Sequence, residues 1–486
     1  MKKDIKVIGS GFSSLAGACY LAKAGHQVTV YEKNATIGGR ARQLKKEDFT
    51  FDIGPTWYWM PDVFERFFAD FGKKPSDYYE LKKLSPAYQV YFGIDEFVMI
   101  SDNLEEIKAT FETIEKGSGK VLQGFMDEAK SNYDIAIKDL VYRPGVSPME
   151  LITVETAMKV GQFFGNISKN VRKKFKNQKL VQILEFPVLF LGAKPSDTPS
   201  FYSFMNYADF GLGTWHPKNG MYSVIQAIEK LAIELGVTIK TDSNISKILV
   251  KDEEAYGLIV NGEFVEADVV LSGADYHHTE TLLDEKHRAY SEKYWESRVF
   301  APSSLLFYVG FDKKIENVEH HSLFFDVDFD VHASDIYDNP KWPENPLFYA
   351  SFPSKTDSNS APEGKESAIF LIPLAPGIED TEALRNQYFE KIVTRLERLT
   401  QQNLKENIIF KESFCKNDFV EQYNSYKGNA YGMANTLLQT AFLRPKLKSK
   451  KVKHLYFTGQ LTVPGPGVPP ALISGKLVAE LIEKHL

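Results

Sequence analysis

The chain has 486 residues, and 58 Lys and Arg against 64 Asp and Glu give a formal net charge of −6, so nothing points to nucleic acid as a partner. Hydrophobic residues at 43% and charged residues at 25% are typical of globular chains and argue against a disordered chain, a collagen-like repeat and a coiled coil. Two cysteines are too few for a disulfide framework or a Cys-rich metal site, and no metal is expected.

The first expected element is a βαβ unit at the N-terminus. Residues 5–8 have the apolar character of a short buried strand, run into a glycine-rich turn, and are followed by apolar residues at helical spacing. A second strand ends at Glu32, about 20 residues beyond Gly11, which is the separation typical of dinucleotide sites. Gly9 permits the tight turn, Gly11 lets a pyrophosphate approach the helix N-terminus, and Glu32 is expected to hold an adenosine ribose.

One position departs from the dinucleotide pattern. Ser14 replaces the third glycine, which normally lets the helix pack closely on the strand, and Gly17 lies one turn further on and offers another close approach. Taken alone, this segment leaves open an ordinary βαβ unit with a glycine turn. A carboxylate at Glu32 disfavours the 2′-phosphate of NADP.

A second motif follows the βαβ unit. Residues 37–42 read Ile-Gly-Gly-Arg-Ala-Arg, which brings the planar guanidinium of Arg40 next to the first loop, and residues 54–56 read Gly-Pro-Thr. In these residues the chain resembles the flavin amine oxidase and phytoene desaturase superfamily. The resemblance implies that Gly39 and Arg40 bind the pyrophosphate of FAD and that residues 54–56 run beside the flavin.

The C-terminal part repeats the arrangement of strand, loop and helix. A strand ends at Gly459, a Pro- and Gly-rich loop follows, and an apolar helix is predicted to start near Val468. Its N-terminus offers unpaired N–H groups and a partial positive charge, which suit negative charge on a reduced flavin. A terminal helix with prolines in its first turn is the simpler alternative.

The C-terminal loop also resembles that of the bacterial carotenoid desaturases, which end in a Thr-x-Pro-Gly-x-Gly-x-Pro loop before the last helix. Many of them have a histidine where this chain has Val463, so a proton-transfer role is not carried over to that position. Residues 215–221 are similar to the family's Trp-x-Pro-x-Gly-Gly element, and Ile245 falls where the family meets the adenine through its backbone. Overall likeness points to the branch that desaturates the 3,4-bond of hydroxylated carotenoids.

The predicted cofactor is FAD. The residues expected to bind it come from the turns, strand ends and helix starts described above and are Gly9, Gly11, Phe12, Ser13, Glu32, Lys33, Gly39, Arg40, Gly54, Pro55, Thr56, Ile245, Gly459, Gly467 and Val468.

The predicted fold class is α/β, with a Rossmann-like FAD-binding domain assembled from residues 1–75, 215–290 and 440–486. The two insertions, 76–214 and 291–439, are expected to form a mixed α/β substrate domain with a helical, membrane-facing part. Aromatic residues make up 13% of the chain. Runs such as 163–164, 186–191, 201–204 and 305–308 each read as core, and together they are a plausible wall for a long hydrocarbon such as a carotenoid.

The sequence predicts no transmembrane helix, because the apolar stretch at 181–193 is broken by Glu185 and Pro187 and is shorter than the ~20 residues a span requires. The N-terminal run does not read as a secretory signal, since cleavage would remove the first glycine motif. We therefore expect a cytoplasmic protein. The basic run 172–179 on a predicted helix reads as a solvated face or as a peripheral membrane contact. The oligomeric state stays open.

The predicted reaction removes two hydrogens from a C–C bond beside a polyene. The sequence offers no Ser/His/Asp set or carboxylate pair that we would call catalytic beyond FAD, and His216 is the nearest, weak candidate. Alternatives within the superfamily are a phytoene desaturase, a carotenoid isomerase and an oxidase of polar amines. An alternative of another class is a flavin-independent prenyl- or lipid-binding module of the GDP-dissociation-inhibitor type, against which the Arg40 motif and the C-terminal loop argue.

Overall fold

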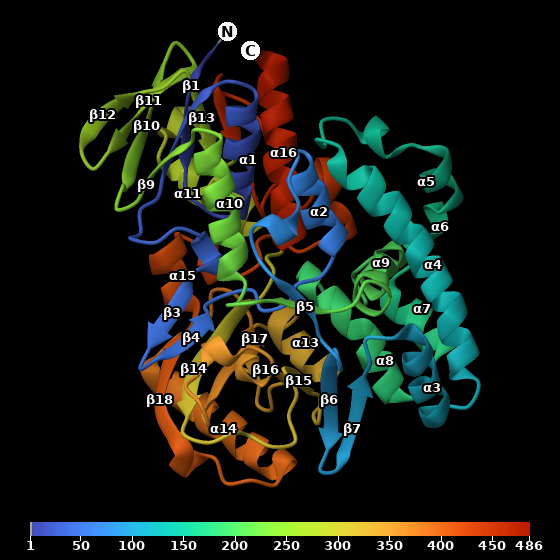
Figure 1. Ribbon diagram of the computed structural model, residues 1–486. Coiled ribbons are helices and arrows are strands. Elements are labelled where there is room, and N and C mark those ends of the chain that lie inside the picture. The colour runs from blue at the N-terminus through green and yellow to red at the C-terminus, as the bar shows by residue number, and fades with distance from the viewer. Residues whose placement is uncertain (1) are drawn as a thin grey trace.

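A five-stranded parallel sheet organises one end of the molecule (Figure 1). The computed structural model describes residues 2–486. Ile5 lies opposite Val28 on one side and Val269 on the other, and all three are buried. The strands come from the three sequence segments expected to form the FAD domain and lie in the order β19 (Leu455–Phe457), β13 (Val269–Ser272), β1 (Asp4–Ile8), β2 (Gln27–Tyr31) and β9 (Thr238–Lys240).

The helices α1 (Phe12–Lys23) and α16 (Val468–His485) lie side by side against this sheet, although they come from opposite ends of the chain (Figure 1). Their close approach depends on Gly475. A Cβ atom there would lie 2.6 Å from the Ser13 carbonyl oxygen and 2.7 Å from the Gly17 nitrogen. Because these neighbours are backbone atoms, they cannot move aside as a side chain would.

The structure explains how Ser14 is accommodated at the position of the third glycine. Ser14 is fully buried and faces Gly273, which follows β13. A Cβ on Gly273 would lie 2.0 Å from the Ser14 hydroxyl oxygen. The space that the missing glycine would have provided on the helix is therefore provided by a glycine on the neighbouring strand end.

A second, seven-stranded sheet forms the opposite end of the molecule (Figure 1). One face of it packs on α14 (Glu382–Thr400) through a cluster of buried apolar side chains that includes Phe307, Phe389 and Ile392. Its strands come from the two insertions and lie in the order β18 (Ile408–Phe414), β14 (Ser303–Phe311), β17 (Glu366–Leu374), β16 (Phe348–Ser351), β15 (His321–Phe324), β6 (Tyr88–Gly93) and β7 (Glu96–Ile100).

The first insertion also contributes a helical layer along one side (Figure 1). Its helices are α3 (Leu104–Ile114), α4 (Ser118–Lys138), α5 (Val154–Met158), α6 (Val160–Phe164), α7 (Ile167–Lys174), α8 (Gln178–Glu185) and α9 (Phe204–Asn206). The remaining elements include the strands β3 (Gln43–Lys46), β4 (Phe49–Asp52), β5 (Leu81–Lys83), β8 (Trp215–Pro217), β10 (Ile245–Lys251), β11 (Glu254–Val260) and β12 (Glu263–Glu266), and the helices α2 (Pro61–Ala69), α10 (Tyr222–Glu234), α11 (Tyr276–Thr281), α12 (Glu292–Glu296), α13 (Phe329–Tyr337) and α15 (Lys416–Tyr423).

The expected α/β fold is confirmed, but the prediction that residues 172–179 lie on one helix is wrong. The run spans the end of α7 and the start of α8. Phe175 between them is extended and buried, and Asn177 caps α8 by accepting a hydrogen bond from the Lys179 nitrogen. Across residues 2–486, no helix combines the length and the apolar character needed to cross a bilayer.

The contact between α1 and α16 gives a test of packing. Gly475→Ala should lower the free energy of unfolding by about 1–3 kcal/mol, because an added methyl group in a filled contact forces the two helices apart. The control is Gly124→Ala on the exposed face of α4, where no atom lies within 4 Å of the added methyl group. It should be neutral or stabilise by up to ~1 kcal/mol. Thermal unfolding measures both, and equal midpoints for the two variants would contradict the packing argument.

Candidate flavin site

A cavity of about 840 Å³ begins at the carboxyl ends of the parallel strands, where Ile8, Tyr31 and Gly273 line it. Ligands of open parallel sheets bind at this edge. Each of the fifteen residues that the sequence assigns to the cofactor lines this cavity. Motifs separated by more than 400 residues are thus brought together at one place.

The glycine turn after β1 presents an open backbone to the cavity. Gly9 has φ +84°, a conformation that favours glycine, and no atom lies within 4 Å of a Cβ built on Gly11. Gly11 is the N-cap of α1, and no side chain caps the helix there. The first N–H groups of α1 are therefore left for an anionic ligand, as a pyrophosphate requires.

Glu32 connects the glycine turn to the end of β2. One carboxylate oxygen accepts from the Ser10 nitrogen at 3.0 Å and from its hydroxyl at 2.7 Å, and the other accepts from the nitrogen and side-chain amide of Asn34, each at 2.9 Å. Glu32 is 4% exposed, and the exposed part faces the cavity. A ribose hydroxyl would join or replace these donors, so Glu32 both shapes the turn and offers an acceptor. The Lys33 ammonium instead donates to the Glu421 carbonyl at 2.7 Å.

Arg40 is a partly buried cation that forms no ion pair with any described residue, although the Asp275 carboxylate acts on its charge over a longer distance. Its guanidinium donates to the Ser425 hydroxyl at 3.0 Å and lies 5.4 Å from the centre of the Tyr423 ring. Its Nε atom is buried without a hydrogen-bond partner, and among residues 2–486 no carboxylate lies within ion-pair distance. Burial lowers the pKa of the guanidinium. A partly buried guanidinium with an unused donor fits the phosphate oxygens of FAD.

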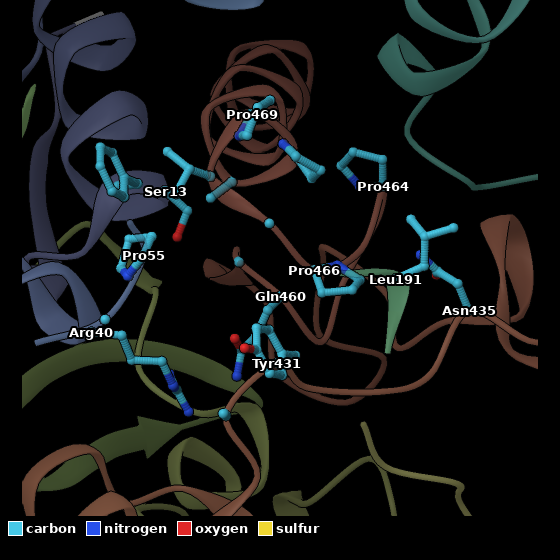
Figure 2. Close-up of a pocket in the computed structure, with 18 of the residues that line it drawn as sticks. Ser13, Arg40, Pro55, Leu191, Tyr431, Asn435, Gln460, Pro464, Pro466 and Pro469 are labelled. Carbon is cyan, nitrogen blue, oxygen red and sulfur yellow. The ribbon is translucent and has the colours of Figure 1, made fainter. Parts of the chain in front are cut away.

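The N-terminus of α16 faces the same space. Gly467 is its N-cap with φ +116°, and no side chain caps this helix either. Figure 2 shows the start of α16, marked by Pro469, above the space that Ser13, Pro55 and Arg40 border on one side. The loop before it is anchored by the Ser474 hydroxyl, which accepts from the Gly459 nitrogen at 3.0 Å. Two helix N-termini and Arg40 therefore place positive charge around one end of the cavity.

Three residues that sequence reasoning missed complete this end: Tyr423 and Ser425 near α15, and Gln460 after β19. Figure 2 shows Gln460 and Tyr431 beside the Arg40 guanidinium. With its amide in the orientation that satisfies its neighbours, the Gln460 oxygen accepts from Arg40 at 3.1 Å and from the Gly432 nitrogen at 3.3 Å. Only the fold brings these residues to Arg40, and no local motif marks them.

His216, the weak catalytic candidate, lies outside the residues that line the cavity. It is 4% exposed on β8, its Nε2 is 3.2 Å from a carboxylate oxygen of Asp357, and its ring lies 4.6 Å from that of His320. The strand β8 pairs with β5, which directs His216 toward the Asp357 loop. The position supports a structural role, because a catalytic group must reach the substrate.

The rest of the cavity is largely apolar. Each of the four aromatic or apolar runs that the sequence marks as a possible wall contributes to it. The contributing residues are Phe163 and Phe164; Phe186, Leu189 and Leu191; Phe201, Tyr202 and Phe204; and Leu306. Nucleotide-binding and apolar surfaces therefore belong to one continuous cavity.

Comparison with known proteins identifies the class. Residues 13–483 match the family of flavin-containing amine oxidoreductases, and the chain belongs to this family. The resemblance stated from the motifs is thereby confirmed, as are the expected FAD cofactor and the assignment as an oxidoreductase. This membership leaves no support for the flavin-independent binding module.

Relatives within the family include desaturases. The chain is 40% identical over 484 residues to a carotenoid 3,4-desaturase of Haloarcula japonica, covering 99% of this chain and 98% of that one. It is 32% identical over 494 residues to a 4,4′-diapophytoene desaturase of Staphylococcus haemolyticus, covering 98% of each.

Solved structures share the fold at lower identity. A Methanosarcina mazei oxidoreductase has a TM-score of 0.63 at 17% identity and covers 99% of this chain and 100% of its own. Putrescine oxidase bound to putrescine has a TM-score of 0.64 at 12% identity and covers 100% of this chain and 99% of its own.

The assignment of Arg40 is tested by flavin content. Arg40→Ala should weaken FAD binding about 10- to 100-fold, because a charge-assisted hydrogen bond contributes about 1.5–3 kcal/mol. The matched control is Arg42→Ala. The Arg42 guanidinium lies 5.3 Å from the same Tyr423 ring but does not line the cavity, so flavin content should stay normal. Fluorescence titration of the apoprotein with FAD gives both affinities. An equal loss of FAD affinity in the two variants would contradict the assignment of Arg40 to the cofactor site.

Proposed function

We propose that this chain is an FAD-dependent carotenoid desaturase that introduces a C=C bond into a long polyene, at the 3,4-bond of a 1′-hydroxycarotenoid. The observation that carries the proposal is the single cavity, in which the nucleotide end is continuous with a long apolar wall. The end-to-end similarity to a carotenoid 3,4-desaturase supports the choice of bond.

The chemistry requires few protein groups. When bound, FAD supplies a two-electron acceptor for the hydride that leaves one carbon, while the neighbouring carbon loses a proton and the C=C bond forms. The protein has to hold the bond close to the cofactor and keep water away. A hydrocarbon is held mainly by apolar surface, at ~25 cal/mol per Å² removed from water, and the aromatic wall offers such surface.

Two alternatives stay within the same chemistry and fold. A phytoene- or diapophytoene-type desaturase is favoured by the 32% identity to the staphylococcal enzymes. A carotenoid isomerase would use the same cavity without net oxidation. An oxidase of polar amines is less well supported, because the similarity to putrescine oxidase is at 12% identity and indicates the fold alone.

We also propose peripheral association with the cytoplasmic face of a membrane, the natural source of a water-insoluble substrate. The support is an exposed apolar cluster around α5 and α6, here called the apolar rim, whose residues are Val146, Met149, Ile152, Val154, Met158, Val160 and Phe164, each 53–77% exposed. Phe164 and the equally exposed Leu438 also line the cavity, so the rim borders an opening of the cavity. Seven exposed apolar side chains within residues 146–164 are more than scattered apolar surface residues explain.

The basic run 172–179 gives little support to the proposed membrane contact. Arg172 pairs with Glu185 at 2.9 Å and with Asp330 at 3.0 Å, and Lys174 pairs with Glu128 at 2.8 Å. Lys179 pairs with Glu96. Charges neutralised within the protein attract an anionic surface only weakly, so the proposal assigns membrane contact to the apolar rim.

Product analysis tests the reaction. Expression in cells that make linear carotenoids, with or without a terminal hydroxyl group, should yield a product two hydrogens lighter and with a longer-wavelength absorption maximum. A product of unchanged mass would favour the isomerase, and desaturation confined to phytoene would favour the phytoene-desaturase alternative. No conversion of any carotenoid by flavin-loaded protein would contradict the proposal.

Vesicle sedimentation tests the membrane contact. The double variant Met149→Glu, Met158→Glu should lose most vesicle binding, because two charges would enter the apolar layer. The control Ile94→Glu changes a residue that is 50% exposed in the turn between β6 and β7 and should bind as the unmodified protein does. Binding should survive high salt, which screens exposed charges over ~10 Å at 0.1 M. Vesicle binding that is abolished by salt and unaffected by the double variant would instead assign the membrane contact to basic residues.

A further inference from the structure

A polar spot interrupts the apolar wall of the cavity. The side chains of Thr56 and Tyr349 both line the cavity, and their hydroxyl oxygens lie 2.8 Å apart. Thr56 comes from the segment 54–56 after β4 and Tyr349 from β16, so the chain that follows the β3–β4 hairpin meets the seven-stranded sheet at the cavity here. Neighbouring lining residues on this wall include the apolar Phe348, Leu371 and Leu306 and a further hydroxyl group, that of Tyr431.

A buried histidine holds the Tyr349 hydroxyl group in place. The Nδ1 atom of His321 lies 2.7 Å from the Tyr349 hydroxyl, and His321 is 0% exposed on β15. Its ring stacks on Trp57, with ring centres 4.0 Å apart and planes 10° from parallel. Burial and the nearby His216 hold the pKa of His321 well below its ordinary value, so the ring is neutral at physiological pH. Two contacts thus fix the ring that orients Tyr349.

The polar spot lies at the flavin end of the apolar wall. Thr56 lies two residues after Gly54. A Cβ on Gly54 would lie 2.0 Å from the Arg40 carbonyl oxygen, so this segment packs directly on the motif assigned to the pyrophosphate. Thr56 itself is among the residues assigned to the cofactor from the sequence. A ligand group held by Thr56 and Tyr349 is therefore close to the place where the reacting bond must lie.

We propose that Thr56 and Tyr349, oriented by His321, bind the hydroxyl group of a hydroxylated carotenoid and thereby select which bond meets the flavin. This inference rests on the proposed function and specifies its substrate. An alcohol can both donate and accept a hydrogen bond. It can therefore bind the Thr56 and Tyr349 hydroxyl groups whichever of them acts as donor. A hydrocarbon lacking the hydroxyl group would leave this spot in contact with apolar surface, which disfavours its binding.

The distance along the carotenoid agrees with this placement. The hydroxyl group then has to lie on C1, in the same end group as the 3,4-bond, and not on C1′ at the far end of the polyene. In such a chain, the carbon that carries the hydroxyl group is separated from C3 by a single carbon. Anchoring the hydroxyl group beside the flavin thus brings the 3,4-bond to the same place. Thr56 and Tyr349 are binding residues in this account, and His321 is a positioning residue.

The affinities of two polyenes for the unmodified protein and for a variant test the proposal. The probes are a linear polyene with one tertiary hydroxyl group at C1 and the same polyene without it, and flavin-loaded protein is titrated with each by fluorescence quenching. The unmodified protein should bind the alcohol at least tenfold more tightly. Tyr349→Phe should reduce this preference to less than threefold while leaving the affinity for the hydrocarbon unchanged. The control is Tyr202→Phe, which removes a cavity-lining hydroxyl that is 2.8 Å from Thr440, and it should keep the preference.

Equal affinities of the unmodified protein for the two polyenes, or an unchanged preference in Tyr349→Phe, would overturn the proposal. Flavin content and thermal midpoint show whether the variant is folded, and Thr56→Val provides the same test if Tyr349→Phe is not. Failure of the proposed function appears separately, as absence of desaturation of either polyene by the unmodified protein. Loss of the preference for the alcohol together with loss of selectivity for the 3,4-bond, read from the products, distinguishes anchoring from a general structural role.

Discussion

The positively charged groups gathered at one end of the cavity are the feature on which the architecture depends. Arg40 is partly buried and forms no ion pair within the described part of the chain, and the uncapped N-termini of α1 and α16 face the same space, which the carboxylates of Glu32 and Asp275 also line. A desolvated guanidinium is unfavourable unless a ligand or a counter-charge compensates it. The pyrophosphate of FAD would supply that compensation, so cofactor and fold are expected to stabilise each other. The close packing of α1 on α16 at Gly475 holds the two helix ends at this position.

The cofactor end could be predicted from the sequence because its chemistry is local. A glycine turn, a helix start and an acid at the end of a strand each have a recognisable spacing, and every residue assigned to FAD lines the cavity. Ser14 departs from the motif, and its compensation by Gly273 lies more than 250 residues away in the sequence. Tyr423, Ser425 and Gln460 reach Arg40 only through the fold, so no spacing could have indicated them.

The substrate end was predictable in character but not in detail. Aromatic runs indicated an apolar wall, yet each run alone reads as core, and only the structure shows which side chains face the cavity. His216 has the residue type of a proton acceptor, but the pairing of β8 with β5 places it beside Asp357. From the sequence the basic run was either a solvated face or a membrane contact, and three of its five basic side chains pair with Glu185, Glu128 and Glu96 from other elements. Long-range pairing of this kind leaves no mark on a local pattern.

In the proposed reaction FAD performs the oxidation, and the apolar cavity with its polar spot at Thr56 and Tyr349 selects the bond. Anaerobic mixing of flavin-loaded protein with a hydroxylated carotenoid tests this most directly. The oxidised-flavin absorbance should bleach while the carotenoid spectrum shifts to longer wavelength, with one new double bond for each flavin reduced. Bleaching without a new double bond, or a carotenoid shift with the flavin still oxidised, would contradict it.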